Sequence, residues 1–180
     1  MVSSSVTDPL HLVKREDPPS GLVFLDVDGV LNSGDGNNAI GQLILDGFVP
    51  VHQDQRWFQP RHIRLLNAIE LRSGARLVLS STWRLSHHEG AVEALMKEAG
   101  YRGRGFFGKT DSGGPTRGAE IRRYLSYHHI LKWARPVPYV VLDDDWDKDL
   151  DPDHFVQTDY QEGLAERHVE RALKILGTIP

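Results

Sequence analysis

Two aspartates, Asp26 and Asp28, stand directly behind a run of apolar residues in the stretch LVFLDVDGVLNS. A continuous apolar run that ends in a turn signal is typical of a strand covered by helices on both faces. Both carboxylates are then expected at the carboxyl end of that strand, where ligands bind in open α/β sheets. Two like charges at one such edge need a cation, a proton or a substrate to offset their repulsion.

Two further apolar runs end in polar clusters. LVLSSTWR stops in the hydroxyls of Ser80–Thr82, and YVVLDDDWD stops in the carboxylates of Asp143–Asp145. In a parallel sheet the three strand ends share one edge, so these side chains are expected to converge. Carboxylates without cysteine suit a hard cation, and Mg²⁺ is the usual choice beside a phosphate because it also binds phosphate oxygens. The pattern therefore predicts a site for a metal and a phosphate.

The elements that must position these residues alternate between strands and helices. HFVQTD is expected to form one more short strand. Helices are expected from Pro60 to Gly74, from Glu89 to Glu98, behind an N-cap at Thr116, and over residues 165–176. The alternation predicts an α/β fold, a Rossmann-like three-layer sandwich with a mostly parallel central sheet.

The spacing of apolar residues also predicts what each helix buries. In the helix that begins at Pro60, the expected core residues are Ile63, Leu65, Leu66, Ile69 and Leu71. The tryptophans are interpreted as packing residues, which is their commoner role: Trp57, Trp83, Trp133 and Trp146.

The bulk composition bounds the class of protein. A chain of 180 residues with 39% hydrophobic residues is the size of one domain with a real core. A net charge of −4 argues weakly against broad nucleic-acid binding, and the lack of cysteine excludes disulfides, thiolate metal sites and a cysteine nucleophile. No apolar run reaches the ~18 residues that a membrane span requires, so we expect no membrane association and a cytoplasmic location.

Two segments stand apart from the alternating pattern. Residues 1–20 mix serine, proline and charge without periodicity, which is typical of a flexible N-terminal arm. Residues 21–180 are expected to form a single domain, with a small flap insert at about 34–57 because that stretch is polar and glycine-rich around one apolar patch.

Four segments, taken in chain order, resemble the motifs of the haloacid dehalogenase (HAD) superfamily phosphohydrolases. DVDGV, from Asp26, is similar to their DxDG[T/V] motif, and the hydroxyl after the strand LVL is similar to the second motif. Arg117 in PTRGAEI, 26 residues before Asp143 (143 − 117), resembles the basic third motif, and VVLDDD resembles the acidic fourth. SSTWR and TDYQEGL, in so short a chain, further resemble the small HAD domains associated with RNA-repair proteins. The resemblance spans about residues 22–176.

The resemblance implies a mechanism. Asp26 would be the nucleophile that forms an aspartyl-phosphate, and Asp28 would protonate the leaving oxygen and then deprotonate the attacking water. Ser80 would hydrogen-bond a phosphoryl oxygen, and Arg117 would offset the negative charge that grows in the transition state.

The resemblance also implies a cofactor and leaves three residues open. Mg²⁺ would be held by Asp26, the backbone carbonyl of Asp28, and Asp143 with Asp144. Three further side chains are alternatives or additions at the substrate: Ser81 in place of Ser80, Lys109 in place of Arg117, and Arg84 as a bidentate clamp on a substrate phosphate. For Arg84, an exposed loop arginine is an equally good interpretation.

The sequence thus predicts a Mg²⁺-dependent phosphatase with a HAD-like fold and a minimal cap. The intervals from Asp28 to Pro60 and from Arg117 to Asp143 hold no full cap domain, and an open site suits a phosphate on a polynucleotide end or another large phosphorylated substrate. The alternative is a non-catalytic HAD-like binding or regulatory module. The physiological substrate and the oligomeric state stay open.

Overall fold

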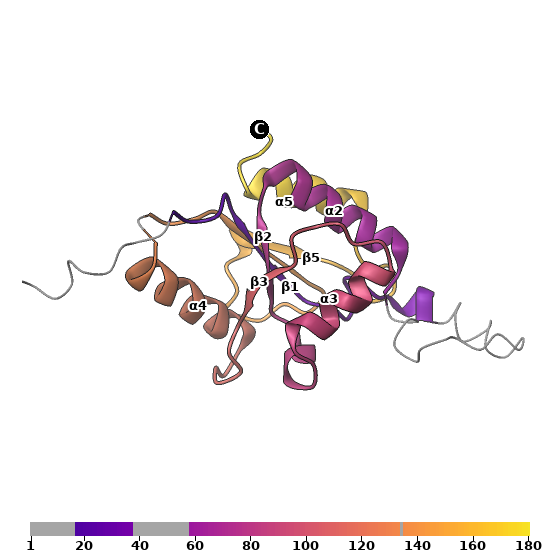
Figure 1. Ribbon diagram of the computed structural model, residues 1–180, viewed down its shortest axis with the longest axis horizontal. Coiled ribbons are helices and arrows are strands. Elements are labelled where there is room, and N and C mark those ends of the chain that lie inside the picture. The colour runs from indigo at the N-terminus through magenta and orange to yellow at the C-terminus, as the bar shows by residue number, and fades with distance from the viewer. Residues whose placement is uncertain (1–16, 38–57, 134) are drawn as a thin grey trace, which may run out of the picture.

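The chain forms an α/β fold around one parallel sheet (Figure 1). The computed structural model describes residues 17–37, 58–133 and 135–180, so most of the expected arm at 1–20 and most of the expected flap insert at about 34–57 lie outside the described residues. Within the described ranges no helix is both long and apolar enough to span a bilayer. The elements are β1 (Leu22–Leu25), α2 (Pro60–Ser73), β2 (Arg76–Leu79), η3 (Thr82–Leu85), α3 (Glu89–Glu98), β3 (Phe106–Lys109), α4 (Arg117–Leu131), β4 (Tyr139–Asp143), η4 (Pro152–His154), β5 (Phe155–Gln157) and α5 (Glu166–Ile175).

The sheet order is β3-β2-β1-β4-β5, and every neighbouring pair is parallel. β1 lies in the centre, with Leu25 opposite Leu79 of β2 on one side and opposite Leu142 of β4 on the other. The residues that follow these three strands therefore meet at one edge, as the sequence predicts. β3 was not predicted, because its four residues, FFGK, contain a glycine and alternate between half-buried and exposed positions.

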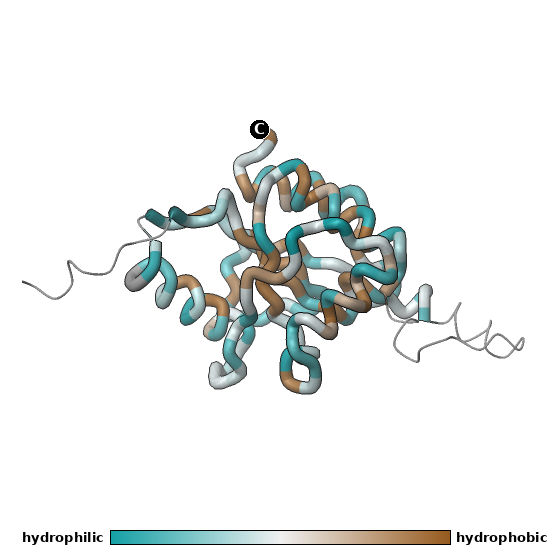
Figure 2. The backbone as a smooth tube through the Cα atoms, in the orientation of Figure 1, coloured by the Kyte–Doolittle hydropathy of each residue, from teal (hydrophilic) through white to brown (hydrophobic). Residues whose placement is uncertain are grey.

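Two apolar cores lie on opposite faces of the sheet, because successive side chains of a strand point to opposite sides. Val23, Leu25, Leu77 and Leu79 pack with helices α2, α3 and α5, whereas the second core joins β1, β2 and β4 to α4. Hydrophobic residues accordingly gather along the strands in Figure 2, and polar ones along the outer helix faces. Each fully buried leucine or valine contributes roughly 1.5–3 kcal/mol, so the two cores hold the strand ends firmly in place.

The helix ends follow local sequence signals. α2 begins with Pro60 at its first position and ends at Gly74, whose φ of 68° is the left-handed conformation that glycine adopts without strain. The prediction that Leu71 belongs to the core was wrong, since this residue is 87% exposed and Glu70 is buried instead. At 100° per residue, Leu71 lies about 200° around the helix from Ile69, on the solvent side.

Candidate active site

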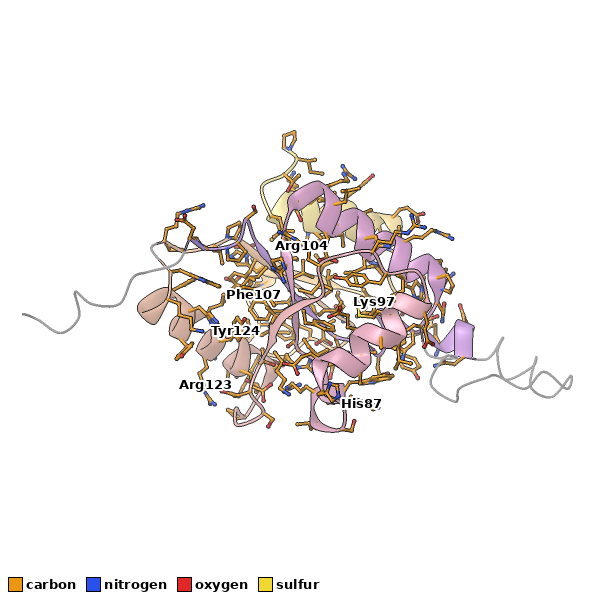
Figure 3. All side chains as sticks on the ribbon, viewed as in Figure 1. His87, Lys97, Arg104, Phe107, Arg123 and Tyr124 are labelled. Atoms are coloured by element: carbon orange, nitrogen blue, oxygen red, sulfur yellow. The ribbon has the colours of Figure 1, made fainter. Side chains whose placement is uncertain are left out.

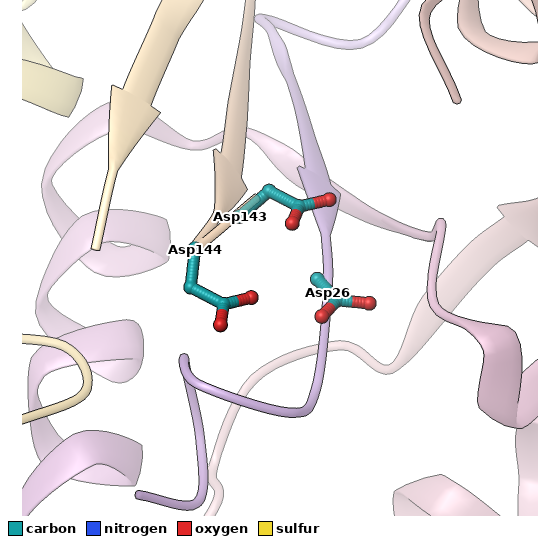
Figure 4. A group of neighbouring side chains, drawn as sticks. All are labelled: Asp26, Asp143 and Asp144. Atoms are coloured by element: carbon teal, nitrogen blue, oxygen red, sulfur yellow. The ribbon is translucent and has the colours of Figure 1, made fainter. Parts of the chain in front are cut away.

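An acidic cluster forms where β1 and β4 end. The carboxylates of Asp26, Asp143 and Asp144 offer oxygen atoms that all lie within 4.8 Å of one another, and Figure 4 shows the three side chains gathered at the two strand ends. The pairing of β1 with β4 places them there, and the Asp26 backbone N–H extends it by donating to the carbonyl of Leu142 at 3.0 Å. The carboxylates behind the first and the third apolar run therefore converge, as expected.

Burial makes the ionised form of two carboxylates in the cluster less favourable. Burial, followed by repulsion from Asp143, raises the pKa of Asp26 to about 7. Burial likewise raises the pKa of Asp143 to about 6, although the Arg117 guanidinium acts in the opposite direction on both groups. The cluster offers carboxylate oxygens alone, which are the ligands that a hard divalent ion such as Mg²⁺ prefers. A bound cation would also offset the repulsion between these acids, so the residues fit the expected metal.

The basic residue beside the acids is Arg117, and not Lys109. Arg117 Nη1 lies 3.2 Å from Asp26 Oδ1 and 3.3 Å from Asp143 Oδ2. Arg117 is the first residue of α4, which starts there because the Thr116 side chain caps the helix by accepting a hydrogen bond from the Ala119 backbone. Lys109 Nζ instead lies 3.3 Å from Glu89 Oε2. Of the two alternatives, the structure brings Arg117 to the candidate nucleophile.

The two serines behind β2 differ in their contacts. The Ser81 hydroxyl hydrogen-bonds Asp26, which favours the ionised form of that carboxylate, and it accepts a hydrogen bond from the Trp83 backbone N–H at 3.3 Å. Ser80 is 1% exposed, and its hydroxyl has no hydrogen-bond partner among the described residues. The contact with Asp26 therefore belongs to Ser81, whereas the sequence preferred Ser80 because it follows the apolar run directly.

Asp28 is not one of the three clustered acids, although its charge raises the pKa of Asp26, and it has two hydrogen-bond donors of its own. Asn32 Nδ2 donates to Asp28 Oδ1 at 2.8 Å, and Trp83 Nε1 donates to Asp28 Oδ2 at 3.0 Å. The sequence did not identify either donor. Directly after Asp28 the backbone turns at Gly29, where φ is 70°. A Cβ added at Gly29 would lie 2.4 Å from Asp144 Cγ. Only glycine therefore lets the Asp28 loop pass over Asp144.

Arg84 has a different environment from either of the two expected for it. Its Nη1 donates to the backbone carbonyls of Ser80 at 3.1 Å and Ser81 at 2.5 Å, and its Nη2 lies 2.5 Å from Glu120 Oε2. The Arg84 and Glu120 side chains are only 6% and 7% exposed. Arg84 is thus neither an exposed loop arginine nor a clamp that faces a substrate. It ties the end of β2 to α4, the helix that carries Arg117.

The parallel sheet, the DxD loop behind its central strand and the arginine at the start of α4 define a HAD-like domain. In agreement, the family model for the HAD domain in Swiss Army Knife RNA repair proteins matches residues 22–169. The chain belongs to this family, which confirms the resemblance found in its motifs. Searches of curated proteins and of solved structures find no match. Family membership supports a hydrolase of the phosphatase kind.

Proposed function

We propose that the chain is a Mg²⁺-dependent phosphomonoesterase that acts through an aspartyl-phosphate on Asp26. The observation that carries this proposal is the convergence of a nucleophile, a cation and a separate carboxylate at one sheet edge. Arg117 contacts Asp26 at 3.2 Å, and Asp28 follows two residues later with hydrogen bonds of its own. An acid at this second position marks the phosphatases and phosphomutases among the proteins that the motifs resemble.

In the first step an Asp26 carboxylate oxygen attacks phosphorus and forms a new O–P bond, while the bond from phosphorus to the leaving oxygen breaks. Asp28 gives its proton to that oxygen, so the product leaves as a neutral alcohol. Arg117 and the Ser81 hydroxyl lie beside Asp26, where they can stabilise the negative charge that develops on the phosphoryl oxygens.

In the second step a water molecule attacks the phosphorus of the aspartyl-phosphate. Asp28, now ionised, takes the proton of this water, and the bond between phosphorus and Asp26 breaks to release inorganic phosphate. Asp28 ends the cycle protonated and Asp26 ends it ionised, so both return to their starting states. The cycle consumes one phosphomonoester and one water molecule.

Asp26, Asp143 and Asp144 are the residues that would hold Mg²⁺, together with the backbone carbonyl of Asp28. When bound, the cation would neutralise charge on the acids and polarise a phosphoryl oxygen. The support for this part of the proposal is geometric: three carboxylates offer oxygen atoms within 4.8 Å of one another, and burial raises the pKa of Asp26 and of Asp143, so a bound cation would stabilise their ionised forms.

For the substrate we propose a phosphate at a polynucleotide end. The description of the family, a HAD domain of RNA repair proteins, supports this choice, and so do the short intervals between motifs, which leave no room for a full cap domain. The net charge of −4 predicts that such a substrate is bound through its end rather than along a broad basic surface.

The proposal is tested by phosphate release from p-nitrophenyl phosphate and from 3′- and 5′-phosphorylated oligonucleotides, with and without Mg²⁺. Wild type is compared with Asp26→Asn, which keeps the shape of the side chain and removes the nucleophilic carboxylate. The expected result is Mg²⁺-dependent turnover that the substitution abolishes, with the oligonucleotides preferred. A wild type that binds Mg²⁺ yet is as inert as Asp26→Asn on all three substrates would overturn the proposal in favour of a binding or regulatory module.

A further inference from the structure

Both oxygens of the Asp28 carboxylate are held by side chains that come from different parts of the chain. Asn32 reaches Oδ1 from four residues further along the same loop, at 2.8 Å. Trp83 reaches Oδ2 from the turn behind β2, 55 positions away, at 3.0 Å. A carboxylate oxygen has about two acceptor sites, so these two contacts leave sites on both oxygens for a transferred proton.

The indole of Trp83 is itself fixed in place. Phe58 packs against it edge-on at 5.4 Å between ring centroids, and the His87 ring stacks on it at 5.1 Å and 26°. His87, labelled in Figure 3, belongs to the turn between η3 and α3. The Trp83 backbone N–H donates to Ser81, the same serine that contacts Asp26. Turning the indole N–H away from Asp28 would therefore cost these ring contacts.

Asn32 is fixed in a similar way. It is 1% exposed, and its Oδ1 accepts a hydrogen bond from the Gly29 backbone N–H at 3.0 Å while its Nδ2 donates to Asp28. The side-chain amide thus spans the loop from one side of Asp28 to the other. An isosteric aspartate could keep the contact with Gly29, but it would place a negative oxygen against the Asp28 carboxylate.

We propose that Trp83 and Asn32 are positioning residues that orient Asp28 for proton transfer to the leaving oxygen. This inference rests on the proposed function, because it assigns a task to the carboxylate that acts there as general acid. Packing alone does not require a hydrogen-bond donor at position 83, since the ring contacts with Phe58 and His87 do not involve the indole N–H. Asn32 Nδ2 and Trp83 Nε1 therefore do more than pack, because both donate hydrogen bonds to Asp28.

The test compares two substrates that differ in how much they need an acid. Phenyl phosphate has a poor leaving group that requires protonation, whereas p-nitrophenyl phosphate releases a stabilised anion that requires little. Trp83→Phe keeps an aromatic ring and removes the N–H. Because a well-placed general acid contributes about 10²–10⁴-fold, misorienting it should lower kcat/KM for phenyl phosphate by about tenfold or more. The fall for p-nitrophenyl phosphate should stay below about threefold.

Trp146→Phe is the matched control, because it makes the same substitution at a half-exposed tryptophan just beyond the acidic run, and it should leave both substrates unchanged. Asn32→Asp is the second variant and should show the same selective loss, so the test does not depend on the folding of Trp83→Phe. Equal losses on the two substrates, or no loss, in a folded variant would overturn the positioning role alone. An inert wild type would instead overturn the proposed function, and this inference with it.

Discussion

Two buried carboxylates of this chain share a raised pKa of about 7, yet they lie in different kinds of surroundings. Asp26 follows the central strand, among Asp143, Asp28 and Arg117. Glu70 lies in the last turns of α2, beside Tyr101, Arg76 and Arg104, and it lines a cavity of about 500 Å³. Burial is the largest cause of the shift in both cases.

A raised pKa does not by itself distinguish Asp26 from Glu70, because burial raises the pKa of both. The oxygen of Glu70 that is unpartnered among the described residues is covered, and Gly103 stands over it so closely that an added Cβ would lie 2.2 Å away. Asp26 instead belongs to a cluster of acids from two adjacent strands, with an arginine in contact. What distinguishes the candidate site is the convergence of groups at the sheet edge.

The sharpest way to separate the two carboxylates is to neutralise each in turn. Asp26→Asn should reduce phosphate release by at least about 10³-fold, because it removes the proposed nucleophile. Glu70→Gln should leave kcat/KM within about threefold of wild type. Both variants are assayed on the same substrate at saturating Mg²⁺. Comparable losses in the two variants would mean that Asp26 and Glu70 do not differ in function.

The buried ion pair between Arg84 and Glu120, behind the candidate active site, should be costly to remove. Glu120→Gln leaves the buried Arg84 guanidinium without its partner charge, and breaking a buried pair destabilises a protein by about 3–5 kcal/mol. Denaturant unfolding measures this loss. The control is Asp111→Asn, which breaks the half-exposed pair with Arg123 and should cost less than about 1 kcal/mol. Equal costs would mean that the Arg84–Glu120 pair is no more than a surface contact.

The cation beside Asp26 should matter for rate more than for substrate binding. Arg117→Met removes the charge that faces Asp26 and Asp143, and loss of one group that stabilises developing charge costs about 10²–10³-fold in kcat. Lys109→Met, at the cation that pairs with Glu89 instead, should change kcat less than about threefold. The reverse order of effects would assign the basic motif to Lys109.

Substitution of Glu70 should change the pH dependence of the free energy of unfolding rather than the activity. Its pKa is raised from 4.5 when unfolded to about 7 when folded, so between these values the folded state keeps a proton that the unfolded state has lost. The free energy of unfolding therefore falls as pH rises from about 4.5 to 7. Glu70→Gln removes this contribution, so its stability relative to wild type should rise across that window by roughly 1–2 kcal/mol, after discounting for solvent screening. Thermal or urea unfolding at several pH values measures the difference, and a constant difference would contradict it.

The three strands that end at the candidate active site could be predicted from the sequence, because a continuous apolar run is a local signal. The apolar runs before Asp26, Ser80 and Asp143 each identify a buried strand. Parallel pairing then brings the strand ends together, whatever conformation the loops adopt. The helices that begin at Pro60 and Arg117 were predicted from a proline and a threonine cap for the same reason. These parts of the fold depend on a few neighbouring residues.

The missing parts depend on contacts between distant residues. Trp83 was interpreted as a packing residue, and it does pack on Phe58. Its indole N–H also reaches Asp28 behind β1, because η3 directs the ring toward that loop. The Arg84 contact with Glu120 joins a residue of η3 to a residue of α4 that is 36 positions away, which no periodicity encodes. Within β3, Gly108 weakens the strand signal.

As the proposed nucleophile, Asp26 should carry the phosphoryl group during turnover. This is measured by mass spectrometry of peptides from the wild-type protein, quenched in acid while it is incubated with a phosphomonoester and Mg²⁺. The expected result is a phosphoryl group on the peptide that contains Asp26, and its loss in Asp26→Asn together with phosphate release. A phosphoryl group on a different residue, or phosphate release that Asp26→Asn leaves unchanged, would show that Asp26 is not the nucleophile.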